Sequence, residues 1–169
     1  MKKFIIPLIF ITFASLYFII ILNKKGSNAV NDNLSKFYSV HSNSGCLIAD
    51  KNMRILMVRS AKTGKYHLPG GTMDNGENAI QTAIRETEEE TGIKPIVVKF
   101  FKTYSNGFTL FLCTANITNI DANHKFLDEI DKVELVNIHN INDEFLRYPS
   151  EYRDILKDKD FISFVTQNG

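Results

Sequence analysis

The chain has 169 residues, which is enough for one domain of ordinary size and a short appendage. Its 20 basic and 19 acidic residues leave a formal net charge of +1. This balance gives no electrostatic reason to grip duplex DNA, so we expect no stable complex with nucleic acid. The sequence leaves the oligomeric state open.

A long apolar segment follows the N-terminus. Residues 4–22 contain no charged side chain, and as a helix they would reach roughly 28 Å, about the hydrocarbon thickness of a bilayer. We therefore expect residues 1–22 to form a single membrane-anchoring helix. The alternative is a cleaved signal peptide that leaves a secreted or periplasmic protein. Lysines flank the segment at both ends, so the side of the membrane stays open, although we favour a cytoplasmic amino terminus.

Residues 23–40 are polar and show no periodicity, which predicts a linker. We place one globular domain over residues 41–169. The domain begins with two short apolar runs, at 45–49 and 54–58, that predict a β-hairpin around residues 50–52.

A loop and a helix follow this hairpin. Residues 66–76 contain a proline and three glycines, which predict a loop. Residues 78–91 predict a helix that Asn78 caps, with Gln81 at the capping-box position and Gly92 at the end.

The rest of the chain continues this alternation. Residues 96–104 and 108–117 are rich in β-forming residues and predict a second hairpin. Residues 133–138 predict a further strand, and residues 150–157 predict a second helix with Ser150 as its cap. Strands and helices in this mixture predict an α/β sandwich, in which helices cover a mixed sheet.

The two cysteines, Cys46 and Cys113, match no metal or redox spacing. Both lie in apolar runs, and a free cysteine is among the most buried residue types. Buried free thiols are therefore favoured over a disulfide.

The helix predicted at 78–91 gathers carboxylates on one face. At about 100° per residue, Glu86, Glu89 and Glu90 share one side, and Glu88 points to the other. Neighbouring carboxylates repel one another, but a bound divalent cation such as Mg²⁺ reverses this effect. A solvated acidic face is the plain alternative, because Glu is a good helix former. The Gly-rich loop that leads directly into the helix favours the metal site.

This stretch resembles the Nudix box: Gly, five residues, Glu, seven residues, Arg-Glu, an apolar residue, one residue, Glu-Glu, one residue, Gly and an apolar residue. One position within the box departs from the pattern, because Thr87 stands where the family has an apolar residue. We expect the Thr87 hydroxyl to bond back to the Ala83 carbonyl. The matching residues are Gly71, Glu77, Arg85, Glu86, Glu89, Glu90, Gly92 and Ile93.

The resemblance implies a Nudix-like α/β/α sandwich with a mixed sheet, and a metal-dependent hydrolase. Its substrate would be a nucleoside diphosphate linked to another group, cleaved at the phosphoanhydride bond by an activated water. The family assigns the metal, Mg²⁺ with Mn²⁺ possible, to Glu86, Glu89 and Glu90 and to the carbonyl of Gly70. Glu86 is a ligand or the general base, and Arg85 orients the carboxylates.

Further residues are candidates for the substrate. The resemblance suggests Gly71 and Glu77 within the box, and Arg59 and Glu129 outside it, with a solvated surface role as the alternative for the last two. Tyr104 and Phe108 could stack on a base, but packing within the hairpin is favoured. A membrane-tethered sensor that binds a nucleotide without turnover is the second hypothesis, and an anchored structural protein is the third.

Overall fold

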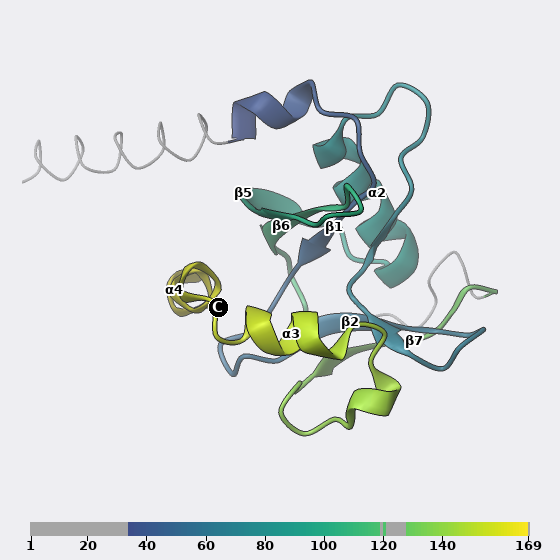
Figure 1. Ribbon diagram of the computed structural model, residues 1–169, viewed down its shortest axis with the longest axis vertical. Coiled ribbons are helices and arrows are strands. Elements are labelled where there is room, and N and C mark those ends of the chain that lie inside the picture. The colour runs from purple at the N-terminus through teal and green to yellow at the C-terminus, as the bar shows by residue number, and fades with distance from the viewer. Residues whose placement is uncertain (1–33, 119, 121–127, 169) are drawn as a thin grey trace, which may run out of the picture. The chain divides into compact units, whose positions relative to one another are not determined.

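The computed structural model describes residues 34–118, 120 and 128–168 (Figure 1). The chain divides into two units, residues 1–35 and 36–169. The apolar segment at 4–22 lies outside the described residues. In the part that is described, no helix has the length and apolar character needed to cross a bilayer.

Four strands of the second unit form a mixed sheet in the order β4-β1-β6-β5. β1 runs parallel to β6 and antiparallel to β4, and β5 and β6 form the antiparallel hairpin that the sequence predicts. The strands are β1 (Ser44–Leu47), β4 (Gly70–Gly71), β5 (Ile96–Thr103) and β6 (Thr109–Thr114).

Three further strands form a second, antiparallel sheet in the order β3-β2-β7. They are β2 (Ile55–Ser60), β3 (Tyr66–His67) and β7 (Ile130–Val136). The hairpin predicted at 45–58 has its turn at Asp50, whose carboxylate accepts hydrogen bonds from two backbone N–H groups. However, β1 and β2 then diverge into different sheets. The expectation of one mixed sheet is wrong in this respect, because strand propensity does not reveal which strands pair.

The helix α2 (Ala79–Thr91) forms as predicted. Asn78 accepts hydrogen bonds from the Ile80 and Gln81 N–H groups, the Gln81 side chain accepts from the Asn78 N–H, and Gly92 ends the helix with a φ of 71°. α2 packs on β1 and β4, on one face of the four-stranded sheet (Figure 1). The local signals at both ends of this helix were sufficient to place it.

The prediction for Thr87 within α2 is wrong. Its hydroxyl is buried and has no hydrogen-bond partner among the described residues. The backward bond of this helix is instead made one turn later, where the Thr91 hydroxyl donates to the Thr87 carbonyl at 2.5 Å. The position that is apolar in the Nudix box therefore carries an unsatisfied polar group in this chain.

Two helices close the chain, α3 (Pro149–Ile155) and α4 (Lys159–Asn168), after a 3-10 turn η2 (Asp143–Phe145). The helix predicted at 150–157 is confirmed, but its expected cap is wrong. Tyr148 takes the N-cap position and makes no capping hydrogen bond with its side chain, and Pro149 starts the helix. The sequence analysis did not predict α4.

The main core lies between the two sheets and the C-terminal helices. It includes Leu112 of β6, Met57 of β2 and Phe161 of α4, each with no exposed surface. On the other face of the four-stranded sheet, Phe111 packs edge-on against Phe37. Phe37 belongs to the 3-10 turn η1 (Lys36–Tyr38), within the range that the sequence suggested as a linker.

Cys46 of β1 and Cys113 of β6 form a disulfide, with their Cα atoms 5.6 Å apart and a sequence separation of 67. The free thiols favoured from the sequence are therefore wrong. Both side chains are buried, as expected. Their pairing follows from the parallel contact of β1 with β6, which joins segments far apart in the chain and leaves no local signal.

Candidate active site

The Gly-rich loop lies against β1 by a close approach of two backbones. Gly70 pairs with Gly45, and a Cβ on Gly45 would lie 2.3 Å from the carbonyl oxygen of Pro69. A Cβ on Gly70 would lie 2.6 Å from the Cα of Gly45. Glycine at both positions therefore sets the distance between β1 and the loop that leads into the site.

Gly71 makes room for a carboxylate of α2. A Cβ at Gly71 would lie 2.5 Å from Oε2 of Glu86. The bare backbone at this position therefore lets the Glu86 carboxylate lie directly against the loop. The sequence had assigned Gly71 to the substrate, and the structure shows a contact with Glu86.

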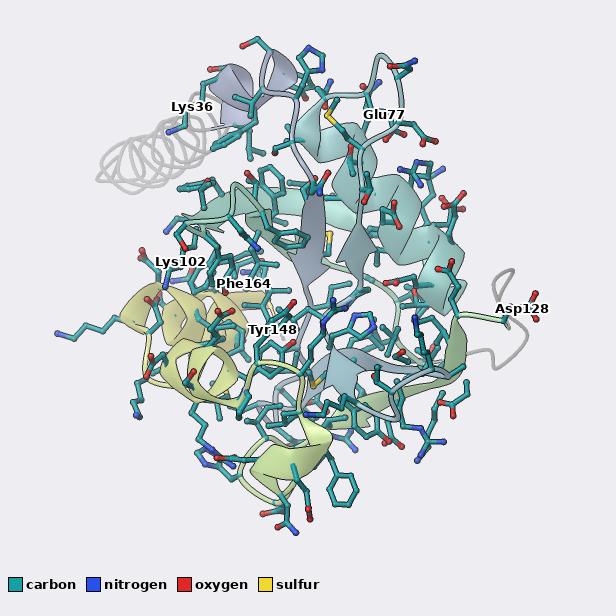
Figure 2. The ribbon with its side chains drawn as sticks, turned by 45° about the vertical axis from the view of Figure 1, so that its right-hand side comes forward. Lys36, Glu77, Lys102, Asp128, Tyr148 and Phe164 are labelled. Carbon is teal, nitrogen blue, oxygen red and sulfur yellow. A yellow bond between two sulfur atoms is a disulfide. The ribbon has the colours of Figure 1, made fainter. Side chains whose placement is uncertain are left out.

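Arg85 holds the carboxylates of the site together. Its Nε donates to Oε1 of Glu77 at 2.8 Å, and its Nη1 donates to Oε2 of Glu89 at 2.8 Å. Its Nη2 lies 3.0 Å from Oε1 of Glu86 and donates to the Thr72 carbonyl at 2.8 Å. These hydrogen bonds raise the pKa of Arg85 and hold the pKa of Glu77 at about 2. Glu77 lies at the start of α2 (Figure 2), so it anchors the loop.

Glu90 is the most buried carboxylate of the site, with 9% of its surface exposed. It accepts a hydrogen bond from the Gly70 N–H at 2.8 Å. Burial raises the pKa of Glu90 to about 8, and the charges of Glu86 and Glu129 act in the same direction. Burial also raises the pKa of Glu86. Burial therefore disfavours the charged form of both carboxylates, and a bound cation would favour it.

The three glutamates expected to bind the metal differ in how free their carboxylates are. Within the described ranges, no three His, Cys, Asp or Glu side chains stand close enough together to hold an ion. Glu89 pairs with Arg85 and would have to leave that partner to bind a metal. Glu86 and Glu90 do fit, because they offer the carboxylate oxygens that Mg²⁺ prefers and lack a full counter-charge. The Gly70 backbone contacts Glu90 through its N–H, and the role of its carbonyl as a metal ligand stays a prediction.

The two substrate-binding candidates outside the Nudix box, Arg59 and Glu129, lie in different surroundings. Arg59 forms a bidentate pair with Asp131, at 2.7 and 2.9 Å, on the three-stranded sheet. Its guanidinium is thus occupied, and the assignment of Arg59 to the substrate is not supported. Glu129 lies close enough to Glu90 to influence its pKa. Its neighbour Asp128 lies at the far end of α2 from Glu77 (Figure 2).

A cavity of about 390 Å³ opens beside Gly70 and Gly71. The β5–β6 hairpin forms one wall of the cavity. The segment that leads into α3 and the first residues of α3 form the other wall. Tyr104 and Phe108 of the hairpin line the cavity and also pack on the main core. Their position therefore fits both packing within the hairpin and stacking on a base. The other residues at the cavity are Asn43, His67, Leu68, Thr72, Ser105, Asn106, Leu110, Arg147, Tyr148, Glu151 and Tyr152.

Arg147 is the functional candidate that sequence reasoning missed. Its N–H donates to the carbonyl of Tyr66 at 2.9 Å, which fixes this segment beside β3. The guanidinium carbon lies 5.3 Å from the centre of the Tyr148 ring. Its charge reaches Glu90 and His67 and influences the pKa of both, although burial has the largest effect on each. The only signal in the sequence was a basic residue and an aromatic residue ahead of a predicted helix.

The NUDIX domain family matches residues 40–159. An RNA pyrophosphohydrolase from Baumannia cicadellinicola subsp. Homalodisca coagulata is 33% identical over 66 residues, which cover 39% of this chain and 42% of that protein. An ADP-ribose pyrophosphatase from Methanocaldococcus jannaschii is 34% identical over 62 residues, which cover 35% of this chain and 37% of that protein. The chain thus spans less than half the length of these curated relatives.

Two solved structures resemble the fold. The crystal structure of a UDP-X diphosphatase has a TM-score of 0.55 at 22% identity, over 83% of this chain and 71% of that one. A NUDIX hydrolase from Nitrosomonas europaea has a TM-score of 0.51 at 21% identity, over 70% of this chain and 89% of that one. At this level of identity the similarity concerns the fold alone.

Proposed function

The chain belongs to the Nudix domain family, and on this basis we propose that it hydrolyses a phosphoanhydride bond in a nucleoside diphosphate linked to another group. One observation carries the proposal: Arg85 draws Glu77, Glu86 and Glu89 together, with Glu86 against the Gly71 backbone. Gly70 and Gly71 in turn line a cavity. Two similar proteins are named as a pyrophosphohydrolase and a pyrophosphatase, which supports the same class of reaction.

We propose Mg²⁺, with Mn²⁺ as a substitute, as the cofactor, held by Glu86, Glu89 and Glu90 with the Gly70 carbonyl. Such a cation neutralises the charge of the diphosphate and orients its oxygens. The buried, partly compensated carboxylates Glu86 and Glu90 support this assignment. Binding requires both in their charged form, so it releases the proton that burial favours on Glu90.

The reaction consumes one water. A new P–O bond forms between the water oxygen and one phosphorus, while the bond from that phosphorus to the bridging oxygen breaks. The bridging oxygen leaves with the other phosphate, so the products are a nucleoside monophosphate and a phosphorylated second group. Glu86 lies against the loop and is the carboxylate placed to accept the proton of the water. Arg85 keeps Glu86 in position through their 3.0 Å contact.

The test uses the full chain in mild detergent with Mg²⁺ and a panel of nucleoside diphosphate derivatives, with mononucleotide release as the readout. We expect turnover of at least one class, and loss of turnover in Glu89→Gln. The matched control is Glu88→Gln, because Glu88 lies on the exposed side of the same helix and pairs only loosely with Lys94 at 3.9 Å. Metal-dependent nucleotide binding without turnover of any compound would favour the sensor hypothesis instead.

We also propose that residues 1–22 anchor the domain to a membrane, with the domain on the non-cytoplasmic side. The uncharged run at 4–22 supports the anchor. The disulfide between Cys46 and Cys113 supports the side, since disulfides persist in oxidising compartments. Protease added to intact cells or spheroplasts should then digest the domain, whereas protection would place it inside. Release of a soluble, shortened chain would indicate a cleaved signal peptide.

A further inference from the structure

Resting on the proposed hydrolase function, we propose that the cavity beside Gly70 and Gly71 holds the nucleobase of the substrate, and that Glu151 makes it selective for guanine.

Aromatic side chains face the cavity from both walls. Tyr104 and Phe108 come from the β5–β6 hairpin. Tyr148 comes from the start of α3 (Figure 2). Flat rings of this kind are the usual surfaces on which a nucleobase stacks. The volume of about 390 Å³ also lies in the range of small-molecule sites.

Two charged side chains orient a ligand in this cavity. Arg147 lies near Glu90, the carboxylate of the proposed metal site. It makes no ion pair within the described part of the chain, so its guanidinium is available to a phosphate. The phosphates of a bound nucleotide would therefore point toward Glu90, with Arg147 beside them.

Glu151, in the first turn of α3, lines the same cavity. Its charge adds to the burial that raises the pKa of Tyr104 to about 12, and it acts on Tyr152 in the same way. The carboxylate thus lies near the aromatic walls. Among the residues that the structure describes, it forms no hydrogen bond or ion pair, so both oxygens are available to a ligand.

An ionised carboxylate can only accept hydrogen bonds, and it accepts two side by side. Guanine presents two adjacent donors, N1–H and the N2 amino group, on one edge. Adenine and cytosine place a ring-nitrogen acceptor beside their amino group, and uracil has a single N–H between two carbonyls, so each would set an acceptor against the carboxylate. The amide oxygen of Asn106 already accepts the Phe108 N–H at 3.0 Å. The NH₂ of Asn106 is therefore left to donate to a carbonyl such as guanine O6.

The experiment compares GDP-, ADP-, CDP- and UDP-linked glucose as substrates of the full chain in detergent with Mg²⁺. Binding of GMP, AMP, CMP and UMP is measured in parallel by calorimetry. We expect kcat/KM to favour the guanine substrate by about ten- to a hundredfold over the uracil one, as for a two-point base contact. Glu151→Gln should remove most of this preference, because an amide offers only one acceptor. Glu144→Gln, an exposed residue of η2 away from the cavity, is the matched control and should keep it.

The outcomes separate this inference from the proposed function. Hydrolysis without guanine preference, or a Glu151→Gln effect equal for all four bases, would overturn the role of Glu151 and leave the hydrolase intact. Absence of hydrolysis, together with GMP binding that Glu151→Gln weakens selectively, would support the guanine site and reject the hydrolase. Absence of both hydrolysis and selective GMP binding would reject the inference as well.

Discussion

Arg85 is in contact with more negative charge than one guanidinium can neutralise. Glu77, Glu86 and Glu89 all lie within 3.0 Å of it, and Asp74 lies 3.6 Å away. A single positive charge shared among these groups fixes their geometry and leaves the site negative overall. An added divalent cation would complete the neutralisation, which is the physical basis for the proposed metal requirement.

The bare backbone at Gly71 gives a prediction about rate. Gly71→Ala places a Cβ 2.5 Å from the present position of a Glu86 carboxylate oxygen, so the flexible carboxylate has to move. We expect kcat to fall by roughly tenfold or more, because a displacement of about 1 Å in a catalytic group is costly. The melting temperature without metal should change little. An unchanged kcat would show that the position of Glu86 against this loop has no catalytic role.

The unsatisfied hydroxyl of Thr87 gives a prediction about stability. Thr87→Val keeps the shape and removes a buried polar group without a partner, so the free energy of unfolding should rise by about 1 kcal/mol. Thr91→Val is the matched control. It removes the bond to the Thr87 carbonyl and the bond from the Ile93 N–H, and it should lower the free energy of unfolding. Denaturant titration of both variants measures the two signs, and a loss in both would contradict the assignment.

At the scale of elements, what the sequence could predict was local. The capping box and Gly92 placed α2, and the turn at residues 105–107 placed the β5–β6 hairpin. The Nudix box then located the carboxylate face. Arg147 escaped prediction because its position depends on a backbone hydrogen bond to Tyr66, distant in the chain. The ion pair of Arg59 was not predictable for a related reason, since its partner Asp131 lies on a strand whose register the sequence does not reveal.

The buried end of α2 should make stability depend on pH. Burial raises the pKa of Glu90 from the usual 4.5 to about 8. Between these values the folded state keeps a proton that the unfolded state has lost. The contribution of Glu90 to the free energy of unfolding should therefore be full below pH 4.5 and fall, by up to about 1.4 kcal/mol per pH unit, as pH rises toward 8.

Denaturant titrations in a chelator across this pH range measure the effect. Glu90→Gln should flatten the slope, since the amide does not titrate. Mg²⁺ should reduce or reverse it in the unaltered chain, because a metal binds the charged carboxylate. An equal slope in Glu90→Gln would assign the pH dependence to other groups.

At the scale of the whole domain, the disulfide joins the strands that support the site. Replacing both cysteines by alanine should lower the free energy of unfolding by about 2–4 kcal/mol, since the cross-link restricts the unfolded chain. Thermal melts of the double variant, with and without a reducing agent, measure this loss. The reductant should destabilise the unaltered chain and have no effect on the variant. Equal stability of the two chains under oxidising conditions would mean that the thiols are unpaired in solution.

The same cross-link encloses the catalytic region in a covalent ring. Gly70, Arg85 and Glu90 all lie between Cys46 and Cys113, which are 67 residues apart in sequence. A single protease cut in the exposed turn at residues 74–76 would therefore open the ring without separating the two pieces. Such a nicked molecule would migrate as one chain in a non-reducing gel and as two fragments after reduction. Both pieces of a chain cut in this turn would thus stay joined in an oxidising environment.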